Sequence, residues 1–332
     1  GPLFEKIINE EEIPELVQGE VVPENEIPII TGPTICGLVE ITRGCGRGCD
    51  FCVPDMLKHR MLPIDHILRE VDVNLKAGRE PLLHAEDVLR YGAKRLEVNK
   101  EAVINLFRQV KNHPGVKSVA ISHFCLSSVA SAPDVVEEIS RILELGKPGG
   151  QVWVSGQTGI ETGSPRLIKK HMLGKCRPFK PEEWPDMVVN AFEILTRNHW
   201  VPCATMLVGL PGETDEDVEI TMKMVEKLRD FKSVIVPMLV VSMDVYPEAF
   251  TVEKMTEKQG ELFLTCWEHD LKWSEMLMAE YVSSCEDSVT GGLKSIMSFT
   301  VSSVTELLHK CRDEYHSNIP AMIRDYKENA EK

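Results

Sequence analysis

The chain has 332 residues and a net charge of −15, with 52 acidic against 37 basic side chains. This balance argues against a general nucleic-acid binder, which needs a basic surface to displace the counterions of the phosphates. Hydrophobic residues make up 43% of the chain and charged residues 27%, an ordinary globular composition that excludes wholesale disorder. No apolar run reaches the ~20 residues of a membrane-spanning helix. The longest, 234–243, is interrupted by Pro237 and Ser242 and is predicted to be a buried strand.

The N-terminal residues lack the basic region, apolar stretch and small-residue cleavage site of a secretory signal. Three of the ten cysteines lie within eight residues and the other seven are scattered, unlike a secreted disulfide framework. A reducing, cytoplasmic location is therefore expected. Residues 1–34 are acidic and contain several prolines, and they predict one short helix, from about Leu3 to Ile8, followed by an extended lead-in.

From residue 35 to 245, short apolar runs alternate with segments of helical spacing. The runs predict strands at 37–42, 81–84, 116–121, 151–155, 202–208 and 233–241. Apolar stripes predict helices around 64–75, 103–110, 135–143 and 187–195. Thr214, followed by three acidic residues, is a capping signal that predicts the start of a fifth helix.

Strands that alternate with helices predict an α/β fold with parallel strands and right-handed crossovers. This pattern fits either a doubly wound open sheet or an incomplete β/α barrel. After Pro247 the strand signals stop, and helices around 252–285 and 293–315 predict a C-terminal helical extension, residues 246–332.

The segment ITRGCGRGCDFC, residues 41–52, contains Cys45, Cys49 and Cys52. Three thiolates at this spacing can converge on one iron–sulfur cube and leave one of its four irons open to a ligand. A structural zinc site would need a fourth ligand and usually pairs of cysteines, and although His59 is near, a second pair is missing. A ferredoxin-like electron carrier would need a fourth cysteine.

Glycines separate these cysteines and precede the first of them. They would let the loop wrap closely around a cluster, because glycine adopts positive φ at no steric cost. The residues are Gly44, Gly46 and Gly48.

The CxxxCxxC spacing, with aromatic Phe51 before the last cysteine, resembles the radical S-adenosylmethionine superfamily. The resemblance implies a partial (β/α)6 barrel of the TIM type over residues 35–245, with a [4Fe–4S] cluster on the three cysteines at the C-terminal mouth of the strands. It also implies that the reduced cluster cleaves S-adenosylmethionine to a 5′-deoxyadenosyl radical, which abstracts hydrogen from an organic substrate. An external electron donor of the flavodoxin or ferredoxin type is implied as well.

The resemblance also suggests cofactor contacts. His84-Ala-Glu86-Asp87 follows the second predicted strand, where the family usually has the Gly-Gly-Glu that receives the methionine amino group. The sequence departs from that pattern, so either Glu86 or Asp87 could make this contact, or both could be capping and first-turn acids of a helix.

Residues 155–165 resemble the Glu-x-Gly-Ser segment that holds the ribose in the branch with methylthiotransferases and cobalamin-dependent enzymes. The resemblance assigns Glu161 to the ribose, because a carboxylate can accept hydrogen bonds from both ribose hydroxyls. It adds Gln157 and Ser164 as cofactor contacts. The alternative is a helix cap or a core network. Residues 208–214, with Gly209 and Gly212, resemble the turn that packs against adenine, although alone they would be a capped strand-to-helix turn.

Other polar residues are more ambiguous. A basic run could meet an anionic substrate but is better explained as a solvated helix face: Arg166, Lys169, Lys170, His171, Lys175 and Arg177. His123 and Cys125 follow the third strand and either face the barrel mouth or occupy core positions. The remaining cysteines are predicted to be small buried hydrophobes: Cys36, Cys176, Cys203, Cys266, Cys285 and Cys311.

The flanks suggest a branch of the superfamily. Residues 3–20 resemble the linker that follows the cobalamin-binding domain of cobalamin-dependent radical enzymes, and Cys266-Trp-Glu-His269 resembles their C-terminal extension. We therefore expect cobalamin, held by a domain outside this chain, and methyl transfer to an unactivated carbon. The alternatives are ring formation or C–C coupling on a lipid, as in tetraether-lipid ring synthases, a methylthiotransferase, and a non-enzymatic iron–sulfur sensor.

Overall fold

The structure is a computed structural model that describes residues 26–53, 58–241 and 249–284, with a few separate residues between 302 and 313. The strands are β1 Leu38–Glu40, β2 Thr42–Arg43, β3 Arg60–Met61, β4 Leu82–His84, β5 Ala120–Ile121, β6 Val154–Glu161, β7 Trp200–Val208 and β8 Val234–Leu239. The α-helices are α2 Ile64–Lys76, α3 Lys100–Lys111, α4 Leu126–Ser131, α5 Pro133–Ile142, α6 Pro165–His171, α7 Leu173–Cys176, α8 Trp184–Arg197, α9 Asp215–Leu228 and α10 Glu257–Ser284. Short 3₁₀ turns are η3 Ile35–Gly37, η5 Val88–Arg90, η6 Pro181–Glu183 and η7 Val252–Lys254.

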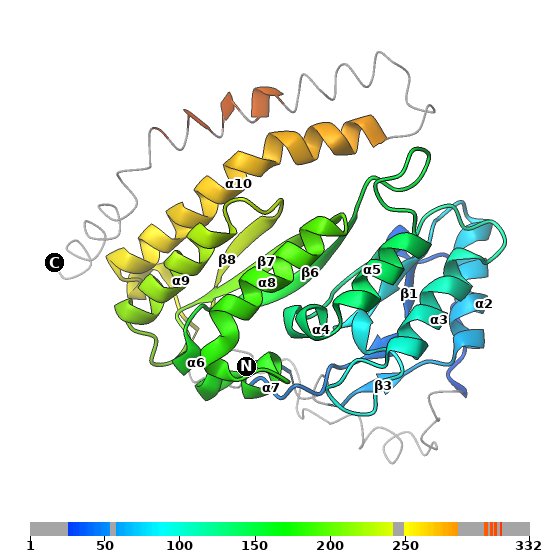
Figure 1. Cartoon of the computed structure of the whole chain (residues 1–332), viewed down its shortest axis with the longest axis horizontal. Helices are drawn as coiled ribbons and strands as arrows, with labels where there is room; N and C mark the ends of the chain where they lie inside the picture. Colours follow the sequence, from blue (N-terminus) through cyan, green and yellow to red (C-terminus); the bar gives the residue numbers. More distant parts are fainter. Residues whose placement is uncertain are drawn as a thin grey trace, which may run out of the picture.

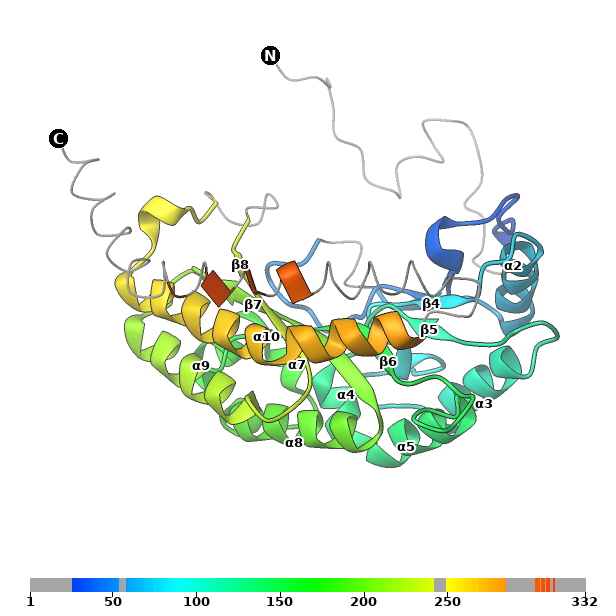
Figure 2. The ribbon, with the colours of Figure 1, turned by 90° about the horizontal axis from the view of Figure 1, so that it is seen from above.

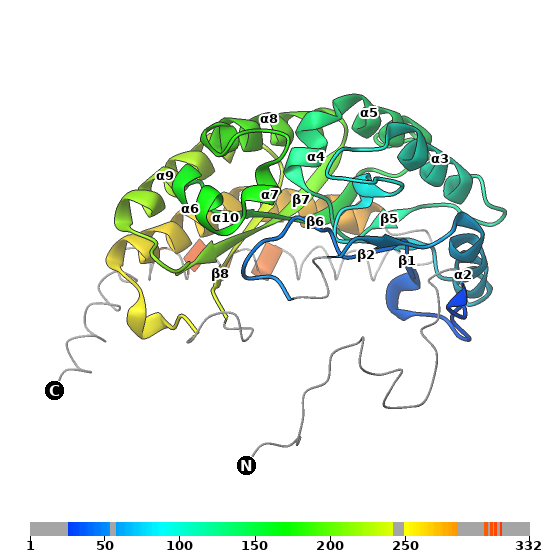
Figure 3. The same ribbon diagram turned by 90° about the horizontal axis from the view of Figure 1, so that it is seen from below.

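The main strands run parallel and follow chain order, as predicted. β1, β4 and β5 pair in one sheet and β6, β7 and β8 in another. The two sheets meet where His123 lies opposite Gln157. There the amide of Phe124 donates to the carbonyl of Gln157 at 3.0 Å, and the amide of Gln157 donates to that of Ser122 at 2.7 Å. The strands therefore form one curved layer, with α3, α5, α8 and α9 on its convex side (Figures 1 and 3).

Helices form where the sequence pattern predicts them, because each buries one apolar stripe against the strands. In α5, Pro133 occupies the first turn and Val135, Val136 and Ile139 are fully buried. The predicted cap of α9 is confirmed, since Thr214 and Asp217 form a capping box in which the amide of Thr214 donates to the carboxylate of Asp217 at 2.9 Å.

Two indoles are fully buried between the strands and helices, and each finds a polar partner. The ring nitrogen of Trp184 donates to the carbonyl of Thr162 at 2.8 Å, and that of Trp200 donates to the hydroxyl of Ser140 at 2.9 Å. Both large side chains therefore add to the core without leaving a buried donor unpaired.

The last strand, β8, is an edge strand, although it was predicted to be buried. Val236 is 36% exposed and Met238 39% exposed. The free edge is protected by two features. The amide of Ile235 donates to the carboxylate of Asp270 on α10 at 2.7 Å. Pro237, two residues further along the strand, has no backbone N–H that could pair with another strand. Helix α10 thus packs along α9 and β8, as Figure 2 shows from above.

The sequence prediction was wrong about the fourth strand. β6 covers residues 154–161, so the expected ribose segment lies within the strand instead of following it. Alternate burial of residues 154, 156, 158 and 160 shows the period-two pattern of a strand, but the strand contains Gly156 and Gly159, and strand propensities disfavour glycine. The β2–β3 hairpin and the short helix α4 were not predicted, whereas α6 and α7 fall in the basic run that was predicted to be helical.

Some predictions fall outside the described residues: the helix at 3–8, most of the helix at 293–315, Cys285 and Cys311. Among the cysteines that are described, Cys176 and Cys266 are buried as predicted, but Cys36 is exposed and Cys203 only half-buried. Cys36 lies in a 3₁₀ turn with φ 54°, which turns its side chain away from the core. None of the described helices has the length and apolarity that a membrane crossing requires.

Candidate radical S-adenosylmethionine site

The cysteine loop leaves the sheet directly after β1 and is closed at its base by the β2–β3 hairpin. Arg43 pairs with Arg60 and Thr42 with Met61, which brings the two ends of the loop together. The predicted positive φ angles are present, at 74° in Gly44, 65° in Gly46 and 69° in Gly48. A β-carbon at these positions would be strained, so the glycines allow the fold of the loop.

Arg47, between the first two cysteines, holds this loop against the helices. Its guanidinium is buried and donates to the carboxylate of Asp87 at 3.0 Å and to the hydroxyl of Ser128 at 2.8 Å. It also donates to the carbonyl of Gly174 at 3.2 Å. A β-carbon on Gly174 would lie 1.9 Å from the carbonyl oxygen of Arg47, so α7 approaches the loop backbone closely.

The thiols of the loop are half-buried and free. Burial raises the pKa of all three, that of Cys49 to about 12, while the positive charge of Lys175 acts in the opposite direction. Within the described residues no His, Cys, Asp and Glu side chains gather as they would around a single metal ion. A four-iron cube holds its thiolates farther apart than a single ion does, and the loop offers three of them.

A second contact fixes the loop near its last cysteines. The amide of Asp50 donates to the carbonyl of His171 at 2.9 Å, and the carboxylate of Asp50 lies 2.7 Å from Nδ1 of the same histidine. Nε2 of His171 in turn lies 2.9 Å from the carbonyl oxygen of Pro211. One buried imidazole therefore links the cysteine loop to the turn after β7. Phe51 packs against the edge of the core beside it.

Glu161 ends β6 in an unusual backbone conformation. Its φ is +64°, the pairing with β7 shifts register beside it, and the amide of Thr162 donates to the carbonyl of Ile160 at 2.8 Å, two residues back. Such a tight turn at a non-glycine residue is strained, and strain of this kind is common at functional sites. The turn directs a buried carboxylate toward the cysteine loop.

The partner of Glu161 is Lys175, whose ammonium lies 2.8 Å from Oε1. Both side chains are largely buried, at 9% and 13% exposure. Burial alone would lower the pKa of Lys175, but the charges of Glu161, Cys49 and Cys125 outweigh it and raise the pKa, so the lysine is a fixed cation. Lys175 and His171 were predicted to lie on a solvated helix face. That prediction was wrong for both, because α6 and α7 turn this part of the run inward.

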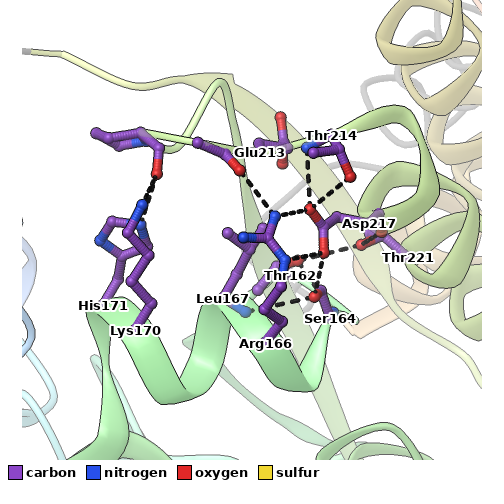
Figure 4. Close-up of polar contacts among 12 residues, drawn as sticks. Thr162, Ser164, Arg166, Leu167, Lys170, His171, Glu213, Thr214, Asp217 and Thr221 are labelled. Carbon is purple, nitrogen blue, oxygen red and sulfur yellow. Dashed lines mark hydrogen bonds and ion pairs between the residues drawn. The ribbon is translucent and has the colours of Figure 1, made fainter.

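Ser164, a predicted cofactor contact, is fully buried and caps α6 (Figure 4). Its hydroxyl accepts from the amide of Leu167 at 3.3 Å and donates to Asp217 at 2.5 Å. Burial would raise the pKa of Asp217, but hydrogen bonds from Arg166, Ser164 and Thr214 lower it to about 2. The structure thus gives Ser164 the alternative role of a cap within a core network.

The turn after β7 carries the predicted adenine glycines. Gly209 has φ +90° and its β-carbon position would overlap the ring of Phe250. Its amide donates to the carboxylate of Glu213 at 2.8 Å, and Gln259 of α10 donates to the same oxygen at 2.7 Å. Gly212 has φ +81°, next to the ammonium of Lys170. The turn is thus a fixed backbone platform at the C-terminal end of β7.

Glu86 and Asp87 have separate environments after β4. Asp87 is buried and fully engaged, since it accepts from Arg47, from the hydroxyl of Ser128 at 2.7 Å and from the amide of Cys125 at 3.2 Å. Oε2 of Glu86 is buried without a hydrogen-bond partner. The negative charge of Glu86 contributes to the raised pKa of the Cys52 thiol. Of the two acids, only Glu86 has an oxygen available for a ligand beside the cysteines.

Other predicted residues line the concave side of the sheet. Nε2 of His123 lies 3.1 Å from the side-chain oxygen of Gln157, and its ring makes an edge contact with His84 at 5.9 Å. Burial, followed by the charge of His84, lowers the pKa of His123. Gln157 is exposed, so it is accessible to a ligand on this side. His123 therefore faces the mouth of the sheet, one of its two predicted placements, and Cys125 is buried in the core.

These positions fit the cofactors that the sequence suggests. Three features lie together at the C-terminal ends of the strands: the unpaired buried oxygen of Glu86, the strained and buried Glu161, and the three thiols of the preformed loop. Arg47 and the inward position of Lys175 were not predicted as parts of the site. An arginine between cluster cysteines was visible in the sequence, but its partners are about 40, 81 and 127 residues away and only the fold brings them together.

Comparisons with known proteins agree with this site. Residues 39–225 match the family model described as the radical SAM superfamily. The chain is 30% identical over 207 residues to the ribosomal protein uS12 methylthiotransferase RimO of Thermotoga petrophila, covering 58% of this chain and 41% of that protein. It is 23% identical over 209 residues to the tRNA-2-methylthio-N(6)-dimethylallyladenosine synthase of Orientia tsutsugamushi, covering 62% and 43%.

Among solved structures, the radical S-adenosylmethionine methyltransferase TsrM of Kitasatospora setae matches with a TM-score of 0.43 and 17% identity. This match covers 61% of the present chain and 35% of TsrM. The chain spans about two fifths of the length of the curated relatives that it matches. The family match covers more than half of the chain and includes the cysteine loop, Glu86 and Glu161, and the protein accordingly belongs to the radical S-adenosylmethionine superfamily, whose enzymes use a [4Fe–4S] cluster and S-adenosylmethionine.

Proposed function

We propose that the curved layer of parallel strands is a partial (β/α)6 barrel of the TIM type, and that this chain is the radical-generating core of a cytoplasmic methyltransferase acting on an unactivated carbon. The observation that carries the radical part is geometric. The three thiols of the glycine-shaped loop lie at the C-terminal ends of the strands together with the unpaired buried oxygen of Glu86 and the strained, buried Glu161. Barrel enzymes keep their active sites at this C-terminal end of the strands.

Each residue of the site has a separate task in this proposal. Cys45, Cys49 and Cys52 would hold the cluster, and the free oxygen of Glu86 would accept from the methionine amino group. Glu161 would accept from the ribose hydroxyls while Lys175 holds its carboxylate in place, with Gln157 beside them. The backbone at Gly209 and Gly212 would support the adenine. When bound, the cluster and S-adenosylmethionine supply the radical that abstracts hydrogen, and the protein orients them and excludes water.

Methyl transfer with cobalamin is the favoured outcome for the substrate radical. Its support is the resemblance of residues 3–20 and of the Cys266–His269 segment to cobalamin-dependent radical enzymes. His269 is buried in α10 and accepts or donates a 2.8 Å hydrogen bond with Ser233, so this segment packs on the barrel and not in solvent. The cobalamin would be held by a domain preceding residue 35, which makes residues 1–34 its tail and 246–332 a helical extension.

Methylthio transfer is the second candidate, because the curated relatives at 30% identity are methylthiotransferases. Cobalamin binding and the group transferred separate the two, because either reaction converts S-adenosylmethionine to both S-adenosylhomocysteine and 5′-deoxyadenosine. A longer form of the protein that includes upstream residues should bind cobalamin and transfer a methyl group without sulfur. An upstream region with no cobalamin binding, together with transfer of a methylthio group, would overturn the methyltransferase proposal in favour of the second candidate.

A further inference from the structure

The first turn of α10 begins with a capping box, formed by Thr256 and Gln259. The backbone amide of Gln259 donates to the hydroxyl of Thr256 at 3.2 Å, and the amide of Thr256 donates to the side-chain oxygen of Gln259 at 2.8 Å. Gln259 is buried, with 4% of its surface exposed. Because its side-chain oxygen accepts from Thr256, its side-chain nitrogen is left to donate to another group.

That group is Glu213, in the turn after β7. The side-chain nitrogen of Gln259 donates to Oε2 of Glu213 at 2.7 Å, and the same oxygen accepts from the amide of Gly209 at 2.8 Å. The ring of Phe250 occupies the side of Gly209 where a β-carbon would lie. One carboxylate oxygen therefore joins the C-terminal helix to the backbone of the turn.

The capping box alone does not explain why residue 259 is a glutamine. Glutamate serves equally well at this position of a capping box, and its negative charge suits the start of a helix. Only glutamine can both accept from Thr256 and donate to Glu213. Residue 259 also lies beyond residues 39–225, which match the family model, so the C-terminal helix adds this contact to the family core.

We propose that Gln259 is a positioning residue for S-adenosylmethionine, which acts through Glu213 to hold the turn after β7 in the conformation that receives adenine. The inference rests on the adenine contact assigned to this turn under the proposed function. It extends the cofactor site to a helix outside the family core, without a contact between that helix and the cofactor.

The charge of Glu213 depends on its two donors. Burial raises the pKa of Glu213, and the hydrogen bonds from Gly209 and Gln259 lower it. The nearby charged groups are engaged elsewhere: Arg166 pairs with Asp217, and Asp215 accepts from the hydroxyl of Thr256 at 2.7 Å. The side-chain amide of Gln259 therefore helps to keep Glu213 an ionised acceptor for the backbone of the turn.

The test removes the donor and keeps the cap. In Gln259→Glu, the new carboxyl can still accept from the amide of Thr256, but at pH 8.5 it places a second negative charge against Glu213. Affinity for S-adenosylmethionine, measured on the reconstituted protein by the change in the EPR spectrum of the reduced cluster, should then fall at least about tenfold. At pH 6 the two carboxyls share a proton and one donates to the other, so affinity should lie within about threefold of the unmodified protein at that pH.

Two further variants separate this effect from folding and from net charge. Glu213→Gln/Gln259→Glu exchanges the two partners, so the new amide at position 213 can accept from Gly209 and donate to the new carboxyl. This double variant should regain affinity at pH 8.5. Gln109→Glu adds the same charge to α3 and should bind normally at both pH values. Methionine has no adenine, so its affinity should be unchanged in Gln259→Glu.

Normal affinity of Gln259→Glu at pH 8.5 would overturn the inference. A loss that persists at pH 6, a loss that the double variant does not restore, or an equal loss of methionine binding would do the same, because each indicates general damage to the site. Gly212→Ala, which strains the turn itself, tests the proposed function separately. Normal binding by this variant would refute the adenine contact, whereas weak binding by Gly212→Ala alone would overturn only the role of Gln259.

Discussion

Gly159 provides the space in which Glu161 meets Lys175. A β-carbon on Gly159 would lie 1.8 Å from Oε1 of Glu161 and 2.6 Å from the ammonium of Lys175. The ion pair beside the cysteine loop thus depends on a missing side chain two residues away on the same strand. This explains why a glycine occurs in β6, where it would otherwise weaken the strand.

We expect Gly159→Ala to separate the pair and to weaken binding of S-adenosylmethionine at least about tenfold, because Glu161 would lose its position. Leaving a buried charge without its partner should also destabilise the protein by roughly 3 kcal/mol. Calorimetric binding and chemical unfolding measure the two effects. Gly32→Ala is the control, since no atom lies within 4 Å of its β-carbon position and its φ is not positive. Normal binding by Gly159→Ala would remove Glu161 from the cofactor site.

The two acids after β4 should respond differently to neutralisation. Glu86→Gln should reduce affinity for S-adenosylmethionine while leaving iron content and stability near normal, because its free oxygen supports no other group. Asp87→Asn should instead lower stability and iron retention, since it weakens the contacts with Arg47 and Ser128. Iron analysis, unfolding and binding assays on both variants check this. A stronger binding defect in Asp87→Asn at full iron content would reverse the assignment.

Iron content also tests the cluster ligands. After anaerobic reconstitution, about four irons should bind per chain, and replacing Cys45, Cys49 or Cys52 with Ala should abolish the cluster. Cys203→Ala is the matched control, because this cysteine is half-buried in β7 and not in the loop. Full iron content in Cys49→Ala would contradict the ligand assignment.

Arg47 should govern how readily the loop accepts its cluster. Arg47→Met keeps the length of the side chain but removes its donors to Asp87, Ser128 and Gly174. We expect faster alkylation of the loop cysteines in the cluster-free protein and slower reconstitution, because the loop would no longer be held in one conformation. Arg43→Met, in an exposed arginine of β2 that pairs with Glu40, should change neither rate. Unchanged alkylation in Arg47→Met would show that the glycines alone shape the loop.

The order of the strands and the position of the cluster loop were predictable because both depend on local patterns. The apolar runs and helical stripes are contiguous, and Cys45, Cys49 and Cys52 lie within eight residues. The environment of Glu161 was not predictable, because its lysine partner lies 14 residues away in a run that resembles a solvated helix face. Only the inward turn of α6 and α7 buries that lysine.

The edge position of β8 could also not be predicted from its apolar residues. Its apolar residues predict a buried strand, but in the described sheets β8 pairs only with β7, and Val236 and Met238 on one of its faces are partly exposed. Pro237 was the available signal, since a proline within a strand pattern favours an edge position.

The neighbours His269 and Asp270 on α10 should give the protein two opposing pH dependences. Burial lowers the pKa of His269 to about 4 and raises that of Asp270 to about 7. The histidine therefore makes the folded protein more stable as pH rises from 4 to 6.5, because only the unfolded chain is protonated there. The aspartate makes it less stable between pH 4 and 7, because there only the folded chain is protonated.

Asp270→Asn should remove the second effect and keep the hydrogen bond from the amide of Ile235, since an asparagine oxygen can accept it. The free energy of unfolding, measured in urea, should then rise with pH from 4 to 6.5 and should exceed that of the unmodified protein by roughly 4 kcal/mol at pH 8. His269→Gln should show the opposite slope, with stability falling between pH 4 and 7. Because the two groups nearly cancel in the unmodified protein, its stability should change little across this range. Parallel pH profiles for the two variants would show that neither group titrates as burial in α10 requires.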